Sequence, residues 1–177
     1  MTDNYDASTD VVDRIADLAP GSATHATRHK REKVAAATQR SYDALFDPAL
    51  PDLKLADRLC VALYASTLSN AAGLAAHYAQ RLASAGVDRA VIEPIARNSL
   101  DALEGQPSHL RAMLNFTRTL IEAPIEGDKA ALERLRDAGM TTPAVVALAQ
   151  LIAFLSYQIR LTAGLRALRA LDETEAA

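Results

Sequence analysis

Apolar residues recur at helical spacing along almost the whole chain, and the strict alternation of a half-buried strand is hard to find. The pattern predicts a short helix over residues 10–18 with Asp10 as its N-cap, preceded by a loose segment 1–9. A break at Pro20 to Ser22 precedes a second helix that we expect to run to about Phe46. Its inward stripe is predicted to be Val34, Ala37, Tyr42, Leu45 and Phe46.

A further break over residues 47–52 separates this N-terminal arm from the rest of the chain. There the spacing predicts six helices, with Ser69 or Asn70 capping the second and Pro94 near the start of the third. Their expected ranges are about 55–67, 70–85, 87–102, 110–121, 128–138 and 143–171. In the fifth helix Leu132 and Leu135 are expected to be the anchors to the core. We therefore predict one all-α domain, with an arm over 1–52 and a core over 53–177.

The last predicted helix is apolar on nearly every side. Such a helix must be buried on every side, and a chain of this size offers little to cover it all. We expect a second subunit to supply the missing surface, which predicts a homo-oligomer. Arg160, in the middle of this helix, would then need a carboxylate or carbonyl partner.

Composition supports the all-α prediction, because Ala and Leu dominate the apolar half of the residues and only 7 are Gly. The net charge of −3 gives no long-range attraction to nucleic acid or to an anionic membrane. The basic run from Arg28 to Arg31 is interpreted as a solvated helix face. With no leader-like start, we expect a cytoplasmic protein.

Candidate chemistry is sparse. The single cysteine, Cys60, excludes an internal disulfide and a Cys-X-X-Cys pair. His25, His29 and His109 show no ligand spacing that we recognise, so we expect no metal site. The sequence contains no phosphate-binding glycine loop and no nucleophile elbow, so no cofactor is expected.

His77 is the main candidate, because it lies in an apolar helical stretch on one stripe with Asn70 and Gly73. It is either a working residue or a hydrogen-bonded core or interface histidine. Gly73 either opens a small-molecule pocket or allows tighter helix packing. Tyr64, Ser66 and Tyr78 are candidates to line the same cavity, or are ordinary packing residues. Arg58 and Arg160 either hold a carboxylate substrate or form ion pairs.

Three stretches carry a resemblance to a known superfamily. LADRLCVALYASTLSNAAGLAAHYAQRL, over residues 55–82, resembles the core helical pair of the carboxymuconolactone decarboxylase (CMD) or AhpD-like (alkylhydroperoxidase D) superfamily. The stretch from LRAMLNFTRTL to SYQIRLTAGL, over residues 110–165, resembles the C-terminal part of its peroxidase-related branch, and DVVDRIADLAPGS resembles the arm of a CMD-domain subgroup. The resemblance covers roughly three quarters of the chain. It implies an all-α fold that assembles as dimers, trimers or hexamers.

In the peroxidases of that superfamily, the resemblance implies a Cys-X-X-Cys-X-X-X-His site with a glutamate twelve residues before the first cysteine. Here His77 matches the histidine, Asn70 and Gly73 occupy the cysteine positions, and Arg58 occupies the glutamate position. Neither Asn nor Gly can be oxidised by a peroxide. Cys60 lies on the preceding helix and could form at most a sulfenate, with no resolving partner in this chain.

Four functions remain as hypotheses. The first, which we favour, is a non-redox member that binds a small molecule or a partner as an oligomer. The second is a decarboxylase or isomerase of a small carboxylate or lactone, with His77 as general acid or base, Asn70 orienting an oxygen and Arg58 or Arg160 holding the carboxylate. The third is a structural oligomer with a vestigial cavity. The fourth is a thiol peroxidase that works through Cys60 or through a partner's thiols.

Overall fold

The computed structural model describes residues 6–103 and 105–175, and within them the chain forms nine α-helices and no strand. The all-α prediction is confirmed. The helices are α1 Val11–Ala16, α2 Ala23–His29, α3 Glu32–Leu45, α4 Leu55–Leu68, α5 Ala72–Ser84, α6 Arg89–Ala96, α7 Ser108–Glu122, α8 Lys129–Asp137 and α9 Thr142–Glu175. Three short 3-10 turns, Ala7–Thr9, Leu100–Ala102 and Pro124–Glu126, lie between them. Of the segment 1–9 that was predicted to be loose, residues 1–5 lie outside the described residues.

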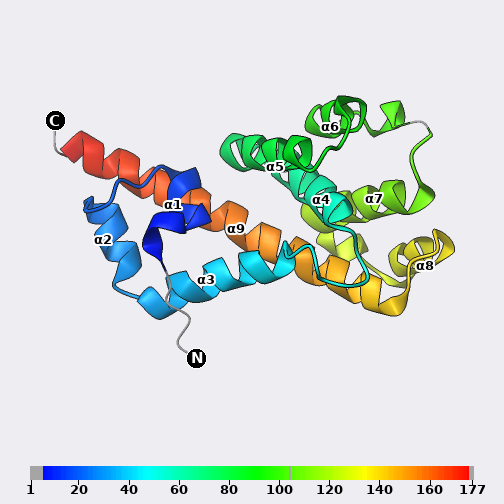
Figure 1. The fold of residues 1–177 in the computed structure, drawn as a ribbon, viewed down its shortest axis with the longest axis horizontal. Helices are drawn as coiled ribbons and strands as arrows, with labels where there is room; N and C mark the ends of the chain where they lie inside the picture. Colours follow the sequence, from blue (N-terminus) through cyan, green and yellow to red (C-terminus); the bar gives the residue numbers. More distant parts are fainter. Residues whose placement is uncertain (1–5, 104, 176–177) are drawn as a thin grey trace.

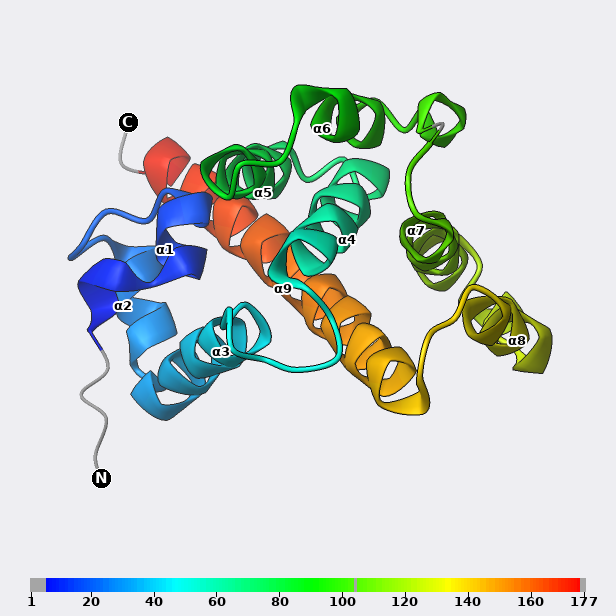
Figure 2. The ribbon, with the colours of Figure 1, turned by 45° about the vertical axis from the view of Figure 1, so that its right-hand side comes forward.

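The long helix α9 is the element on which the others assemble (Figures 1 and 2). The N-terminal arm of α1, α2 and α3 packs on α9 of its own chain, and α4, α7 and α8 also contact it. Helix α1 makes a second contact, with α5. The arm therefore lies between the C-terminal helix and the helix that carries His77.

Helix α4 lies at the centre of the core. Every residue from Arg58 to Ser66 is buried, because α5, α6, α7 and α9 surround it. In the single chain α9 leaves Val146, Tyr157, Leu168 and Leu171 exposed, so its burial on every side by a second subunit stays a prediction. By length and composition alone α9 could cross a membrane over Thr142–Thr174, and 39% of its most apolar 18-residue window is buried inside the fold.

The predicted helix over 22–46 is two helices with a turn at Lys30 and Arg31. The interpretation of the basic run as a solvated face is wrong for its first half, because Arg28 forms ion pairs with Asp10 and Asp13 of α1. These ion pairs connect α2 to α1. Of the predicted inward stripe, Tyr42 and Phe46 are buried as expected, whereas Val34 and Ala37 are exposed. Ala35, Ala36 and Thr38 are the other buried residues of α3.

The start of α5 also differs from its prediction. Asn70 does not cap α5 but ends α4 in the left-handed region (φ 53°), where the Ala71 N–H donates to the Ser66 carbonyl. Helix α6 ends at Ala96, and Pro94 lies inside it rather than at its start. In α8 the inward residues are Ala131 and Leu135, and Leu132 is exposed. The predicted cap at Asp10 is confirmed, since its carboxylate accepts the Asp13 N–H at 3.0 Å.

A cleft between the arm and the histidine helix

His77 faces a cleft of about 850 Å³ between α5 and the N-terminal arm. Helix α5 contributes His77, Gln80, Arg81 and Ser84, which are three or four residues apart and so share one helical face. The opposite wall comes from the arm. It consists of Thr9, Val11, Arg14, Gln39, Tyr42, Asp43, Ala44, Phe46, Asp47 and Pro48.

Three polar side chains converge on His77. Its Nε2 lies 2.7 Å from the Tyr42 hydroxyl, and its Nδ1 lies 3.5 Å from Nη2 of Arg14. Arg81 donates from Nη1 to the same Tyr42 hydroxyl at 2.6 Å. The Arg81 guanidinium also stacks over the rings of Tyr42 and Phe46, with Cζ 5.4 and 5.0 Å from the ring centroids. The four residues of the cluster thus come from α1, α3 and α5.

The electrostatics of this cluster keep His77 uncharged at neutral pH. Burial, followed by the charges of Arg14 and Arg81, lowers the pKa of His77 to about 4. Burial raises the pKa of Tyr42, against the opposing charge of Arg81. Both groups therefore stay neutral at pH 7, next to two guanidinium charges.

The hydrogen-bond directions follow from the donors available. A guanidinium only donates, so the contact from Arg14 makes Nδ1 of His77 the acceptor and places the ring proton on Nε2. That proton is donated to the Tyr42 oxygen, which also accepts from Arg81. The Tyr42 oxygen accepts both of these hydrogen bonds, so its own O–H remains available to donate to an acceptor in the cleft.

No family model and no curated protein matches this sequence. Several solved structures match the fold, and two of them are as follows. An AhpD-core structure, an uncharacterized peroxidase-related protein from Ralstonia eutropha JMP134, superposes with a TM-score of 0.69 at 24% identity, covering 78% of this chain and 71% of that one. An uncharacterized peroxidase-related protein from Silicibacter sp. TM1040 superposes with a TM-score of 0.68 at 17% identity, covering 76% and 69%. The chain has the AhpD-like fold.

Asn70, Gly73 and His77 share one face of the chain segment around α5, but α1 packs across that face and separates the first two residues from His77. Asn70 and Gly73 line a separate hollow of about 270 Å³ with Ile15 and Arg166, whereas His77 faces the larger cleft. A methyl group added at Gly73 would lie 3.4 Å from Cγ2 of Ile15. Of the two interpretations of Gly73, the geometry favours close packing of α1 against α5.

Arg58, at the glutamate position, does not reach the cleft. It is 1% exposed and donates to three backbone carbonyls, from Nε to Leu53 at 3.1 Å, from Nη2 to Asp47 at 2.8 Å and from Nη1 to Leu45. Burial lowers its pKa, with the charge of Asp47 opposing. Arg58 therefore fixes the segment between α3 and α4, and its assignment as a substrate carboxylate holder has no support in the geometry.

The remaining predicted cavity residues lie elsewhere in the fold. Tyr64 donates to Asn98 at 2.8 Å and accepts from Arg118, on the far side of α4, and Ser66 donates to the Ala62 carbonyl of its own helix. Tyr78 is buried and donates to Gln158 of α9 at 2.6 Å. Arg160 is exposed on α9. None of the four lines the cleft at His77.

Cys60 is 2% exposed within α4. Burial, with a smaller contribution from Asp57, raises the pKa of its thiol to about 12. Because the thiolate is the nucleophile, this environment suppresses reaction with a peroxide.

The sequence interpretation missed the three polar residues that cluster with His77 in the cleft. Arg81 lies four residues after His77 on the same helix, so helical spacing could have identified it. Arg14 and Tyr42 come from other elements, and only the tertiary fold brings them to His77. His25, His29 and His109 showed no ligand spacing that we recognised in the sequence, yet in the fold His25 and His29 meet at Asp13, while His109 lies 3.5 Å from Asp57.

Proposed function

We propose that this chain is a non-redox member of the peroxidase-related group that binds a small carboxylate in the cleft beside His77. Two observations support its non-redox character. Asn70 and Gly73 stand at the cysteine positions of the resemblance, and the buried Cys60 has a thiol pKa of about 12. The chain thus offers no reactive thiolate among its own side chains.

The observation that carries the carboxylate proposal is the pair of guanidinium groups around a neutral histidine. Both Arg14 and Arg81 lower the pKa of His77, and no carboxylate contributes in the opposite direction. The charges that act on the His77 ring are therefore both positive, while the arm wall of the cleft also carries Asp43 and Asp47. The volume of about 850 Å³ lies within the usual range for small-molecule sites, and the Tyr42 hydroxyl adds a donor for a carboxylate oxygen.

The alternative of an acid–base enzyme receives less support. A general base works best with a pKa near the operating pH, and a His77 pKa of about 4 makes the ring a weak base at neutral pH. The helpers expected for that chemistry, Asn70, Arg58 and Arg160, do not line the cleft. Binding needs only the guanidinium groups and the hydroxyl that are present.

The test is a titration of the His77 ring protons by NMR, with and without succinate or benzoate. A carboxylate bound between Arg14 and Arg81 adds a negative charge beside the ring, so we expect the His77 pKa to rise well above 4 when the ligand is bound. Arg14→Gln and Arg81→Gln should weaken binding by roughly tenfold each, since each removes a charged hydrogen bond. Arg97→Gln, at an exposed arginine just after the end of α6 that does not line the cleft, is the matched control.

The proposal fails if neither anion changes the His77 titration or the neighbouring signals at millimolar concentration. It also fails if Arg97→Gln weakens binding as much as the cleft variants do. Binding to a surface patch rather than to the cleft would give that second result.

A dithiol-coupled peroxide assay tests the non-redox part separately. We expect no turnover from the wild-type chain. Asn70→Cys with Gly73→Cys then asks whether the scaffold still supports the thiol chemistry, although Ile15 of α1 packs against position 73. Turnover by wild type that disappears in Cys60→Ser would overturn the proposal and restore the thiol-peroxidase alternative.

We further propose that the chain works as a homo-oligomer. The support is the set of apolar side chains that α9 leaves exposed in the single chain, Val146, Tyr157, Leu168 and Leu171. Sedimentation equilibrium of wild type should give more than one chain per particle. Leu168→Glu with Leu171→Glu should yield monomers if α9 forms the interface, whereas a wild-type monomer would refute the proposal.

A further inference from the structure

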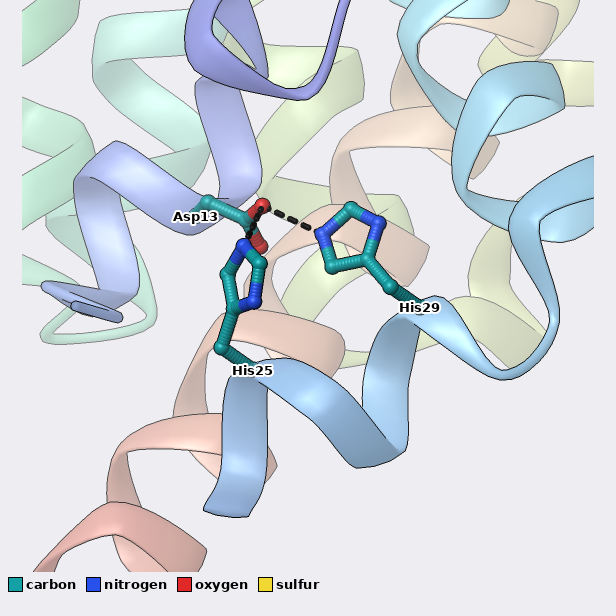
Figure 3. A group of neighbouring side chains, drawn as sticks. All are labelled: Asp13, His25 and His29. Atoms are coloured by element: carbon teal, nitrogen blue, oxygen red, sulfur yellow. Dashed lines mark hydrogen bonds and ion pairs between the residues drawn. The ribbon is translucent and has the colours of Figure 1, made fainter. Parts of the chain in front are cut away.

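Two histidines and one aspartate meet where α1 and α2 join (Figure 3). His25 and His29 are four residues apart on α2, so their rings project from one face of the helix. Both Nε2 atoms point at the same oxygen of Asp13 on α1, at 3.7 Å from His25 and 2.7 Å from His29. One ligand atom from each of the three lies within 4.8 Å of the others.

The second oxygen of Asp13 pairs with Arg28, whose Nη1 also lies 3.3 Å from Nε2 of His29 and would have to move aside for a metal ion. Nη1 of Arg28 binds this Asp13 oxygen at 2.6 Å, and Nη2 of Arg28 reaches Asp10 at 3.1 Å. Asp10 and Asp13 are 2% and 6% exposed. An ion pair on one carboxylate oxygen orients the other toward an incoming ligand, which is how outer partners orient metal-binding carboxylates.

The site is partly accessible. Its carboxylates, Asp10 and Asp13, both pair with the one guanidinium of Arg28. The side chains of His25, His29 and Asp13 are 18%, 16% and 8% exposed, which leaves a path to solvent. A metal ion could enter without unfolding the arm.

We propose that Asp13, His25 and His29 bind one divalent transition-metal ion of the zinc class. Two imidazole nitrogens and one carboxylate oxygen form a donor set that suits Zn²⁺ and its neighbours, with a remaining position for water or an exogenous ligand. Donor atoms about 2.1 Å from a tetrahedral ion lie roughly 3.4 Å apart. The two contacts to the Asp13 oxygen, 2.7 and 3.7 Å, bracket that spacing, so small side-chain rotations suffice.

The ion joins the first two helices of the arm. Asp13 is followed directly by Arg14, whose guanidinium contacts His77, so the metal site and the cleft share helix α1. Loading the metal would fix the position of α1 relative to α2. The site is nevertheless distinct from the cleft, because neither His25 nor His29 lines it.

The test uses the untagged full chain in metal-free buffer, because a histidine tag binds zinc itself. Competition of Zn²⁺ with a chromophoric chelator should give one ion per chain, and Zn²⁺ should raise the melting temperature. His25→Ala and His29→Ala should each weaken binding by at least about tenfold, and the double variant should lose the saturable site. His109→Ala is the matched control, because it also removes one partly buried histidine near an aspartate, at the Asp57 end of the fold.

A second measurement does not depend on the folding of any variant. One equivalent of Co²⁺ added to wild type should give the visible absorption of a nitrogen-ligated, low-coordinate ion. The proposal is overturned if that absorption is absent, if the double variant binds Zn²⁺ like wild type, or if His109→Ala loses as much affinity as His25→Ala.

Discussion

His77 should make the stability of this protein depend on pH in a defined direction. In the unfolded chain its pKa is about 6.5, and in the folded chain burial, Arg14 and Arg81 lower the pKa to about 4. Between these values the unfolded chain binds a proton that the folded chain does not. The free energy of unfolding therefore falls as the pH falls from 6.5 to about 4, and the His77 contribution is fully present above pH 6.5.

The magnitude follows from the same shift. Each pKa unit corresponds to about 1.4 kcal/mol, so the full shift would give roughly 3 kcal/mol. His77 lies at the edge of an open cleft, where solvent screens part of this difference. We expect a loss of about 1–2 kcal/mol between pH 7 and pH 4 that is attributable to this ring alone.

The assay is urea unfolding followed by circular dichroism at pH 7, 6, 5 and 4, for wild type and for His77→Gln. Subtracting the two profiles cancels the other titrating groups, because they are common to both chains. Wild type should lose 1–2 kcal/mol more than His77→Gln over this range, and Arg14→Gln should shrink the excess. Parallel profiles for wild type and His77→Gln would refute the argument, as would a His77 NMR titration centred near 6.5.

Three further predictions follow from single contacts. Arg58→Met should lower the free energy of unfolding by about 3 kcal/mol, because it leaves three backbone carbonyls without their donor; a loss below 1 kcal/mol in urea unfolding would contradict this. Gly73→Ala should leave the free energy of unfolding unchanged or raise it by up to about 1 kcal/mol, because the methyl group fits against Ile15. Gly73→Leu should lower it by about 1–3 kcal/mol, because the larger side chain does not fit there. Thermal melts of the two variants check both signs. Cys60 should resist iodoacetamide at pH 8 in the native chain and react quickly in urea, because its thiolate fraction in the native chain is roughly a thousandfold below that of an exposed thiol. Rapid labelling of the native chain would contradict this by showing that the thiol is accessible.

The parts of the fold that sequence patterns predicted well are those fixed by local rules. Asp10 caps α1 as predicted, because its side-chain oxygen accepts a free N–H of the first turn of α1, and Thr141 does the same at the start of α9. Gly86 and Gly139 follow helix ends with positive φ angles, which glycine adopts without a steric penalty. Such signals depend on neighbours within a few residues.

The errors concern residues whose environment is set by distant segments. The single helix predicted over 22–46 is divided because Arg28 pairs with Asp10 and Asp13 of α1, which no local spacing reveals. The same holds for the cleft: His77 was identified from its own helix, but Arg14 and Tyr42 reach it across 63 and 35 residues of sequence. For Arg58 the sequence suggested either a substrate carboxylate or an ion pair, because its actual acceptors, three main-chain carbonyls, have no side-chain signature.

The three-carbonyl contact of Arg58 also bears on how the cleft recognises a ligand. The segment that it holds includes Asp47, which lies in the cleft wall beside Pro48. A wall fixed from within the core does not have to be ordered when a ligand arrives, so its conformational entropy is lost at folding rather than at binding. A mutation at Arg58 should therefore reduce ligand affinity although Arg58 does not contact the ligand. Without its contacts the wall is ordered only when the ligand binds, and the lost conformational entropy then opposes binding.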